Sequence, residues 1–369
     1  MKKFFFILII LVSAGIGGWT GYHSSEVNSD LTELWFQLGF ILIAIGLFSI
    51  VHIIIHELGH LIAAKLTGYR FLYFRVMSWA LVKEQSKFRI ARFSIAGTAG
   101  QCLMIPPSNV EPMPYKLYLW GGALANFAVG LIGIVLNGFV FDSLYLYIFS
   151  ITSLIFGIIN IYPFSFNDGN TVKHLNRDPV KRQQFFQQLE LAGSFTIGKE
   201  FEAVDTQTLI ENPNEPITEQ YNAFVTLAKV YRELERENFG HALEILEPLW
   251  QQRNDLVKPY QIEVMREYLF CHLTLGLHET SIQDEILQDK LFREYLKTKQ
   301  LETYRMQAAI SLWVEYDLNQ AQEWISKARD SLKQSPTYAD KALNTKLLNF
   351  ISLKVKQEKA EKITMNGIE

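Results

Sequence analysis

Cysteine is scarce in this chain of 369 residues, which contains only Cys102 and Cys271. Two cysteines so far apart argue against a disulfide framework and supply too few thiolates for a cysteine-based metal site. We therefore expect both to be ordinary buried side chains. An excess of positive charge is also lacking, because the formal net charge is −3, and nucleic-acid binding is not predicted.

Charge of either sign is rare in the first half of the chain. Residues 1–169 contain ten of the 35 Lys and Arg residues and eight of the 38 Asp and Glu residues. Residues 170–369 contain all the others. This asymmetry predicts a membrane-embedded first half and a soluble second half.

Four apolar stretches are long enough, or nearly so, to cross a membrane, which takes about 20 residues of helix. They are residues 1–22, 34–64, 117–141 and 143–167. The first is short, and Ser13-Ala14-Gly15 offers a small-residue cleavage site. A signal peptide is therefore an alternative to a first transmembrane segment.

The loops between these stretches predict their orientation. Residues 65–116 contain eight Lys and Arg, whereas residues 23–33 contain none and the short connection at Asp142 contains none. An excess of basic residues marks the cytoplasmic side of a membrane. The sequence therefore predicts that residues 65–116 and everything after Asp168 are cytoplasmic.

Three ionisable side chains lie close together near the end of the second stretch, in the run His56-Glu57-Leu58-Gly59-His60. Residues four apart share one helix face, so His56 and His60 can hold a zinc ion between them. Zinc lowers the pKa of a bound water toward neutrality, and Glu57 can then act as its general base. Such residues in a transmembrane helix are costly and usually functional. The alternative interpretation is a polar helix end at the cytoplasmic interface.

A catalytic zinc usually has three protein ligands and one open position, so a third ligand must come from elsewhere. Asp168 follows the fourth stretch directly and is predicted to lie on the same side of the membrane as the two histidines. The alternative is a turn residue, because Asn167-Asp168-Gly169 is also a good turn sequence. His52 shares the helix face of His56, and we expect it to line the site or hydrogen-bond a neighbour rather than bind the metal.

Three short patterns occur in order on three consecutive apolar stretches. The first is His56–His60 after apolar residues. The second, Asn160-Ile161-Tyr162-Pro163-Phe164-Ser165-Phe166-Asn167-Asp168-Gly169, has the spacing of Asn-x-x-Pro-x-Pro-x-x-Asp-Gly, with Ser165 in place of the second proline and Asn167 where leucine is frequent. Between them, Gly121-Gly122-Ala123-Leu124-Ala125-Asn126 has the form of a Gly-Pro-x-x-Asn run with alanine replacing proline. Over roughly residues 34–170, the chain resembles the site-2 protease family of intramembrane zinc metalloproteases, in its bacterial form without a PDZ domain.

The resemblance implies one Zn²⁺ per chain, bound by His56, His60 and Asp168, with Glu57 as the general base. It also implies that Asn126 and Asn160 help to bind substrate backbone or a developing oxyanion. The alternative for these two amides is hydrogen bonding between helices. The departures at positions 123 and 165 concern loop geometry and leave the metal ligands intact.

The implied fold is an all-α polytopic membrane protein with an intramembrane metalloprotease core at residues 31–170. Within the core, the loop at residues 67–116 contains a partial strand-like alternation at residues 88–95, interleaved with basic residues. By resemblance this is a membrane-associated β region that holds an extended substrate, and the alternative is an amphipathic interfacial loop. The implied location is the bacterial cytoplasmic membrane, with the active site toward the cytoplasm.

The second half of the chain, residues 180–369, is charged and is predicted to be a soluble, cytoplasmic helical domain. Three stretches have the pattern of helix pairs, at about residues 217–251, 260–290 and 301–334. Ala242 with Leu246 and Ala321 with Ile325 resemble positions of a tetratricopeptide repeat, although the spacing is irregular. A plain helical bundle is the alternative.

The sequence therefore predicts a zinc metalloendopeptidase that cleaves membrane-anchored substrates within the lipid bilayer. By family analogy, its substrates are membrane-anchored regulators of transcription or leftover signal peptides. The helical domain is expected to bind a protein partner. The competing hypotheses are an inactive membrane scaffold and a metal transporter, because His and Asp also line ion paths.

Overall fold

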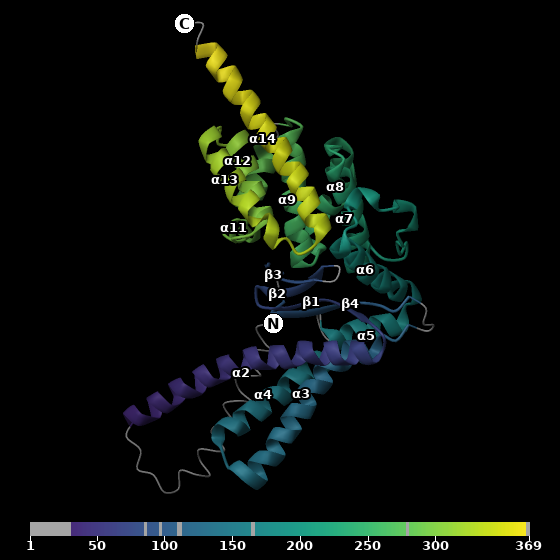
Figure 1. Ribbon diagram of the computed structural model, residues 1–369, viewed down its shortest axis with the longest axis vertical. Coiled ribbons are helices and arrows are strands. Elements are labelled where there is room, and N and C mark those ends of the chain that lie inside the picture. Colours follow the sequence, from purple (N-terminus) through teal and green to yellow (C-terminus); the bar gives the residue numbers. More distant parts are fainter. Residues whose placement is uncertain are drawn as a thin grey trace. The chain divides into compact units, whose positions relative to one another are not determined.

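The computed structural model describes residues 31–84, 87–95, 98–108, 113–163, 167–277 and 280–366 (Figure 1). The chain divides into two compact units. One holds the residues up to Phe71 together with Gly100–Arg177, and the other holds Leu72–Ala99 together with Asp178–Glu369. The first predicted apolar segment, residues 1–22, lies outside the described residues.

Three helices of the first unit are long and apolar enough to cross a membrane. They are α2 (Leu31–Leu66), α3 (Lys116–Leu136) with its π-helical continuation η2 (Asn137–Phe141), and α4 (Leu144–Ile161). The candidate spans within them are Gly39–Leu66, Lys116–Phe141 and Leu144–Ile161. Among the described residues, these spans coincide with three of the predicted apolar stretches.

The third of these helices ends earlier than the sequence pattern predicts. We expected the apolar segment 143–167 to form one span, but α4 ends at Ile161, and Tyr162 is already extended at φ −73° and ψ 124°. Pro163 explains this end, because a proline disfavours helical geometry in the residue before it. The next helix, α5 (Asp168–Arg177), begins with the predicted metal ligand.

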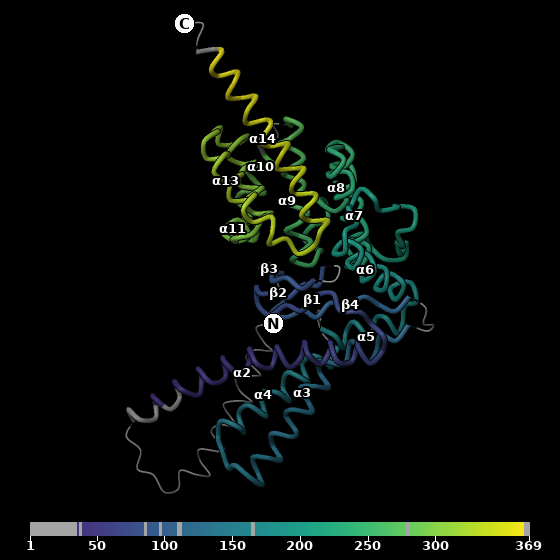
Figure 2. The backbone as a smooth tube through the Cα atoms, in the orientation of Figure 1, coloured from purple at the N-terminus to yellow at the C-terminus, as the bar shows by residue number. Residues whose placement is uncertain are grey.

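Glycines allow the three long apolar helices to approach each other closely, and all three pack together (Figure 2). A Cβ atom on Gly121 of α3 would lie 2.5 Å from the carbonyl oxygen of Gly59 in α2. A Cβ on Gly130 of α3 would lie 2.7 Å from Leu154 Cδ2 in α4. Backbone contact of this kind is the usual way in which membrane helices associate without a hydrophobic driving force.

The loop between α2 and α3 forms strands β1 (Arg70–Val76), β2 (Trp79–Glu84), β3 (Lys87–Arg92) and β4 (Gly100–Ile105). The first three make an antiparallel meander in the order β3-β2-β1. Strand β4 belongs to the first unit and packs along α2. The sequence pattern indicated strand-like structure only at residues 88–95, and the resemblance implied a small β region within residues 67–116. The structure confirms a small sheet in this region, and its individual strands were not predicted.

The meander packs one face into the second unit. Ala80, Val82 and Ala91 are buried, and their neighbours Trp79, Leu81 and Ile90 on the opposite face are exposed. Arg89 of β3 donates hydrogen bonds to the carbonyl oxygens of Ser335 at 2.7 Å and of Lys333 and Pro336 at 3.4 Å. The meander is therefore attached to the helical part of its unit.

The rest of the second unit is an array of helices, which we call the helical domain (residues 178–366; Figure 1). Its helices are α6 (Pro179–Ile197), α7 (Gln220–Glu235), α8 (Phe239–Gln251), α9 (Lys258–Thr274), α10 (Thr280–Gln288), α11 (Lys290–Leu296), α12 (Leu301–Trp313), α13 (Leu318–Ser331) and α14 (Tyr338–Asn366). Short 3₁₀ turns η3 (Phe201–Ala203), η4 (Thr206–Thr208), η5 (Arg253–Asp255) and η6 (Leu332–Gln334) connect some of them.

Neighbouring helices of the domain pack in pairs, notably α7 with α8 and α12 with α13. Each predicted helix pair corresponds to consecutive helices of the structure. Ala242, Leu246, Ala321 and Ile325, the positions that resemble a tetratricopeptide repeat, are all fully buried in one core. Their burial shows why the pattern is apolar, and membership of that repeat class stays a prediction.

Candidate metal centre

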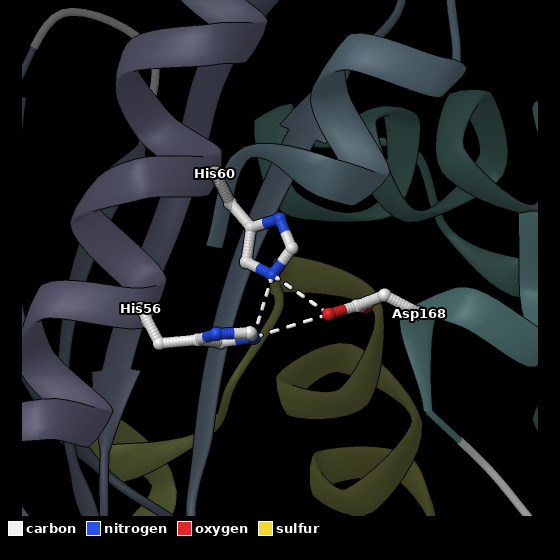
Figure 3. A group of neighbouring side chains, drawn as sticks. All are labelled: His56, His60 and Asp168. Atoms are coloured by element: carbon white, nitrogen blue, oxygen red, sulfur yellow. Dashed lines mark hydrogen bonds and ion pairs between the residues drawn. The ribbon is translucent and has the colours of Figure 1, made fainter. Parts of the chain in front are cut away.

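The first unit brings His56, His60 and Asp168 together from two helices. The two histidines are one turn apart on α2, and their residues are 8% and 6% exposed. Asp168 is the first residue of α5, and its side chain is 22% exposed. Figure 3 shows the carboxylate of Asp168 directed toward both imidazole rings.

The three side chains offer one donor atom each to a common point. His56 Nε2 lies 3.0 Å from His60 Nε2 and 3.1 Å from Asp168 Oδ2, and His60 Nε2 lies 3.3 Å from the same oxygen (Figure 3). In a tetrahedral zinc site with bonds of about 2.0–2.1 Å, two ligand atoms lie roughly 3.3 Å apart. Both the donor types and their separations therefore fit zinc.

A backbone carbonyl fixes the orientation of the His60 ring. His60 Nδ1 lies 2.8 Å from the carbonyl oxygen of Tyr118 in α3. A carbonyl only accepts, so Nδ1 carries the proton and donates it to this bond, and Nε2 keeps its lone pair for a metal. Metal-binding histidines are commonly oriented in this way.

His56 is held by Asn126 and Gly122 of α3. The Asn126 side-chain nitrogen lies 3.4 Å from His56 Nδ1, and Asn126 Oδ1 is buried without a hydrogen-bond partner among the described residues. Rotating the amide so that its oxygen faces Nδ1 gives this oxygen a donor and leaves His56 Nε2 free for a metal. A Cβ atom on Gly122 would lie 2.5 Å from His56 Cε1, so this position has room only for glycine.

Asn167 and Gly169 set the position of Asp168. The Asn167 side chain donates to the carbonyl oxygens of Ile159 and Tyr162 at the end of α4, 2.5 Å from each, and accepts from Asn170 N at 3.0 Å. It thus caps the start of α5 and joins it to the end of α4. A Cβ atom on Gly169 would collide with the carbonyl oxygen of Ile161.

The electrostatic surroundings keep Asp168 charged. Burial alone raises the pKa of its carboxyl group, but the charge of His60 when its Nε2 is also protonated, and hydrogen bonds from both histidines, outweigh this effect; a bound cation would take the place of these protons. The pKa of Asp168 is therefore held well below its ordinary value. An anionic oxygen at this point is what a divalent cation requires.

Replacement of Asn167 by alanine is expected to weaken zinc binding although no ligand is removed. The variant loses the cap of α5, which lowers the stability of this helix by about 1 kcal/mol. It also loses the hydrogen bonds to the end of α4 that position Asp168. Loss of such an outer partner typically lowers metal affinity about 10–100-fold. The measurement is zinc affinity by competition with a fluorescent chelator, with Asn170→Ala as the matched control. Equal affinities for the two variants would contradict the role assigned to Asn167.

Glu57 lies beside the three donors and not among them. Its residue is 7% exposed, and its carboxylate accepts a hydrogen bond from the backbone of Cys102 in β4. A Cβ atom on Gly100 would collide with Glu57 Oε1, so the start of β4 packs directly on this carboxylate. The strand and the helix together hold Glu57 next to the metal-binding point.

The structure does not bring His52 or Asn160 into this group. His52 Nε2 donates to the carbonyl oxygen of Phe149 in α4 at 2.9 Å, which is the neighbour contact that the sequence favoured. Asn160 Nδ2 donates to Phe156 O of its own helix at 2.9 Å. A role of Asn126 or Asn160 toward substrate or oxyanion stays a prediction, because the contacts of both are with protein groups.

Sequence reasoning missed several groups that shape the centre. The carbonyl of Tyr118 and the backbone of Cys102 act through main-chain atoms, for which no side-chain pattern exists. The cap formed by Asn167 did have a signal, because asparagine is a favoured N-cap residue, but Asn167 was considered only as part of the alternative Asn-Asp-Gly turn. Cys102 and Cys271 are free and buried, as expected.

Comparison with known proteins adds no assignment to this geometry. No protein-family model, no curated protein sequence and no solved structure matches the chain. The function must therefore be argued from the candidate metal centre and from the apolar helices that carry it.

Proposed function

We propose that the protein is an intramembrane zinc metalloendopeptidase of the site-2 protease type. One observation carries the proposal. Two histidines of an apolar helix and an aspartate of a separate helix place three donor atoms 3.0–3.3 Å apart, with a buried glutamate beside them. An HExxH helix with a distant carboxylate ligand is the arrangement that zinc proteases use to cleave peptide bonds.

In this mechanism zinc, when bound, polarises a water and lowers its pKa toward neutrality. Glu57 accepts the proton of the attacking water and passes it to the leaving amine. Asp168 stays ionised, and His60 keeps its Nε2 lone pair through its bond to Tyr118. The low exposure of these side chains limits competition from bulk water, which strengthens electrostatic interactions in the site.

The proposed substrate is a membrane-anchored protein or peptide. The HExxH run lies within the candidate span Gly39–Leu66. The substrate must therefore bring its scissile bond to the metal at the depth of the membrane. The excess of Lys and Arg in residues 65–116 supports a site toward the cytoplasm of a bacterial membrane. Regulators of transcription that are released from the membrane and leftover signal peptides are the proposed classes, with the helical domain binding a partner or a substrate tail.

Two other functions are less well supported. An inactive scaffold has no need for a complete set of His56, Glu57, His60 and Asp168, and the close packing of Gly100 on Glu57 would have no purpose in it. A metal transporter would need to release its ion. Retention of stoichiometric zinc through purification, without zinc flux in reconstituted vesicles, would contradict transport.

The substrate can be identified by comparing the membrane proteomes of cells that express the wild type or Glu57→Gln. We expect at least one membrane-anchored protein to accumulate uncleaved with the variant, because the general base is missing while the metal ligands remain. Affinity purification of the variant should recover the same protein.

The matched control is Asp142→Asn, which makes the same change from carboxylate to amide in the short connection between η2 and α4. Asp142 is an exposed residue at φ 40°, and asparagine tolerates this left-handed backbone conformation. Identical membrane proteomes for the wild type and for Glu57→Gln would contradict the protease proposal.

A further inference from the structure

Tyr118 of α3 makes two buried hydrogen bonds that lead to different parts of the candidate metal centre. Its carbonyl oxygen accepts from His60 Nδ1 at 2.8 Å. Its hydroxyl donates to the carbonyl oxygen of Cys102 in β4, also at 2.8 Å. The orientation of a metal ligand accounts for the first bond, whereas the second has no role in the proposed chemistry.

The two bonds belong to a closed circuit of contacts among α2, α3 and β4, all within the first unit. The backbone of Cys102 also bonds to the carboxylate of Glu57 in α2. Glu57 and His60 are three residues apart on that helix, so they are neighbours on its surface. The circuit therefore leaves α2 at His60, crosses α3 and β4, and returns to α2 at Glu57.

The position of Cys102 in the sheet explains why side chains bind its backbone. Among the described strands, β4 is the last in the order β3-β2-β1-β4, so one of its edges has no neighbouring strand. The N–H and C=O groups of one strand residue point to the same edge. At Cys102 these groups bond to Glu57 and to the Tyr118 hydroxyl. The residue is 5% exposed, and unpaired backbone groups would be costly there.

Neighbouring rings fix the direction of the Tyr118 side chain. The residue is 5% exposed, and its ring centre lies 5.0 Å from that of Tyr69 and 5.9 Å from that of His60. Close contacts with two rings restrict the rotation of a buried side chain. The hydroxyl is therefore held at the carbonyl oxygen of Cys102, and this part of β4 is tied to α3.

We propose that Tyr118 is a positioning residue that sets the place of the Glu57 carboxylate through the backbone of Cys102. This inference rests on the proposed protease function, in which Glu57 is the general base. A general base must lie within about 2.6–3.2 Å of the group from which it takes a proton. Through its carbonyl oxygen and its hydroxyl, one residue of α3 thus sets the distance between a metal ligand and the base.

Tyr118→Phe tests the proposal, because it removes the hydroxyl and keeps both the ring and the carbonyl oxygen that accepts from His60. We expect its zinc content, and its KM for a transmembrane peptide, to equal those of the wild type. We expect kcat to fall about 10–100-fold, because misplacement of a reacting group by about 1 Å can cost 10²-fold. An unchanged kcat would overturn the proposal, and so would loss of zinc, which would show a general defect of the site.

The Glu57→Gln background tests whether Tyr118 acts through Glu57. Tyr118→Phe should lower kcat in the wild type and cause no further loss in Glu57→Gln, because the carboxylate that it displaces is already missing. A residue that only stabilises the fold would lower kcat by the same factor in both backgrounds. That result would overturn the proposal.

Tyr69→Phe is the matched control for the loss of a buried tyrosine hydroxyl. Tyr69 is 2% exposed, and its hydroxyl has no hydrogen-bond partner within the described part of the chain. The substitution removes one oxygen from the ring beside Tyr118 and breaks no described bond. We expect zinc content, KM and kcat to match the wild type, and a kcat as low as that of Tyr118→Phe would contradict the role of the Cys102 bond.

Hydrogen exchange tests the bond to Cys102 without any substrate. In the full-length protein, the backbone amides of Gly100–Ile105 should exchange about tenfold faster in Tyr118→Phe than in Tyr69→Phe, as expected for the loss of one buried hydrogen bond. Mass spectrometry of the exchanged peptide measures this difference, and equal exchange would overturn the proposal. Absence of cleavage by the wild type would instead refute the protease function, and exchange in β4 would still decide whether Tyr118 holds this strand.

Discussion

Purified Glu57→Gln protein is expected to keep one zinc ion per chain and to cleave a transmembrane peptide about 10²–10⁴-fold more slowly than the wild type. Glutamine has the size and shape of glutamate, so it fits under Gly100 and accepts the backbone bond of Cys102. It cannot accept the proton of the attacking water. The variant therefore separates zinc binding, which it should keep, from proton transfer, which it should lose.

The measurements are zinc content by plasma mass spectrometry and cleavage rate by mass spectrometry of the peptide. Asp142→Asn is the control for the loss of a carboxylate from the first unit and should match the wild type in both. Equal cleavage rates for Glu57→Gln and the wild type would show that Glu57 is not the base. Loss of zinc from this variant would show instead that Glu57 is a ligand.

The residues of the candidate metal centre could be predicted because their signal is chemical and local. His56 and His60 are one helical turn apart in the apolar stretch 34–64, whose other ionisable groups are His52 and Glu57, and the helix itself converts this spacing into a shared face. The prediction of Asp168 required further evidence, because this residue lies far from His60 in the chain. The predicted order of membrane segments, and the resemblance of Asn160–Gly169 to a family motif, provided that link.

The close support of the site could not be predicted from the sequence. Gly59, Gly100 and Gly122 are needed because a neighbouring backbone, carboxylate or ring, respectively, lies against each of them, and such contacts depend on the packing of separate elements. The bond between His60 and Tyr118 uses a carbonyl oxygen that every residue possesses. Sequence shows where such groups exist, but only the fold shows which of them meet.

The loop between α2 and α3 was the least predictable part of the fold. Its strands have irregular alternation, because residues such as Arg75 are buried while Trp79 and Ile90 are exposed. Arg75 donates to the carbonyl oxygen of Met77 at 2.6 Å, and this bond makes its burial tolerable. Helix pairs of the helical domain were easier to predict, because α8 and α13 bury apolar residues at regular helical spacing.

Replacement of Asp168 by asparagine is expected to reduce zinc affinity by more than about 100-fold, since loss of a mere outer partner of a ligand already costs 10–100-fold. The amide has nearly the same size, so it keeps the start of α5 and the packing of Gly169 intact. It lacks the negative charge that balances the cation. His56 and His60 alone then form an incomplete site.

Zinc affinity should be measured by chelator competition on Asp168→Asn, on Asp142→Asn and on the wild type, each with a circular dichroism spectrum to compare helix content. We expect only Asp168→Asn to lose zinc, and to lose cleavage with it. Full zinc affinity in Asp168→Asn would assign Asp168 to the turn between α4 and α5, which was the alternative interpretation of Asn167-Asp168-Gly169. Zinc loss with unchanged helix content would support its place as the third ligand, since α5 would then have formed without the metal.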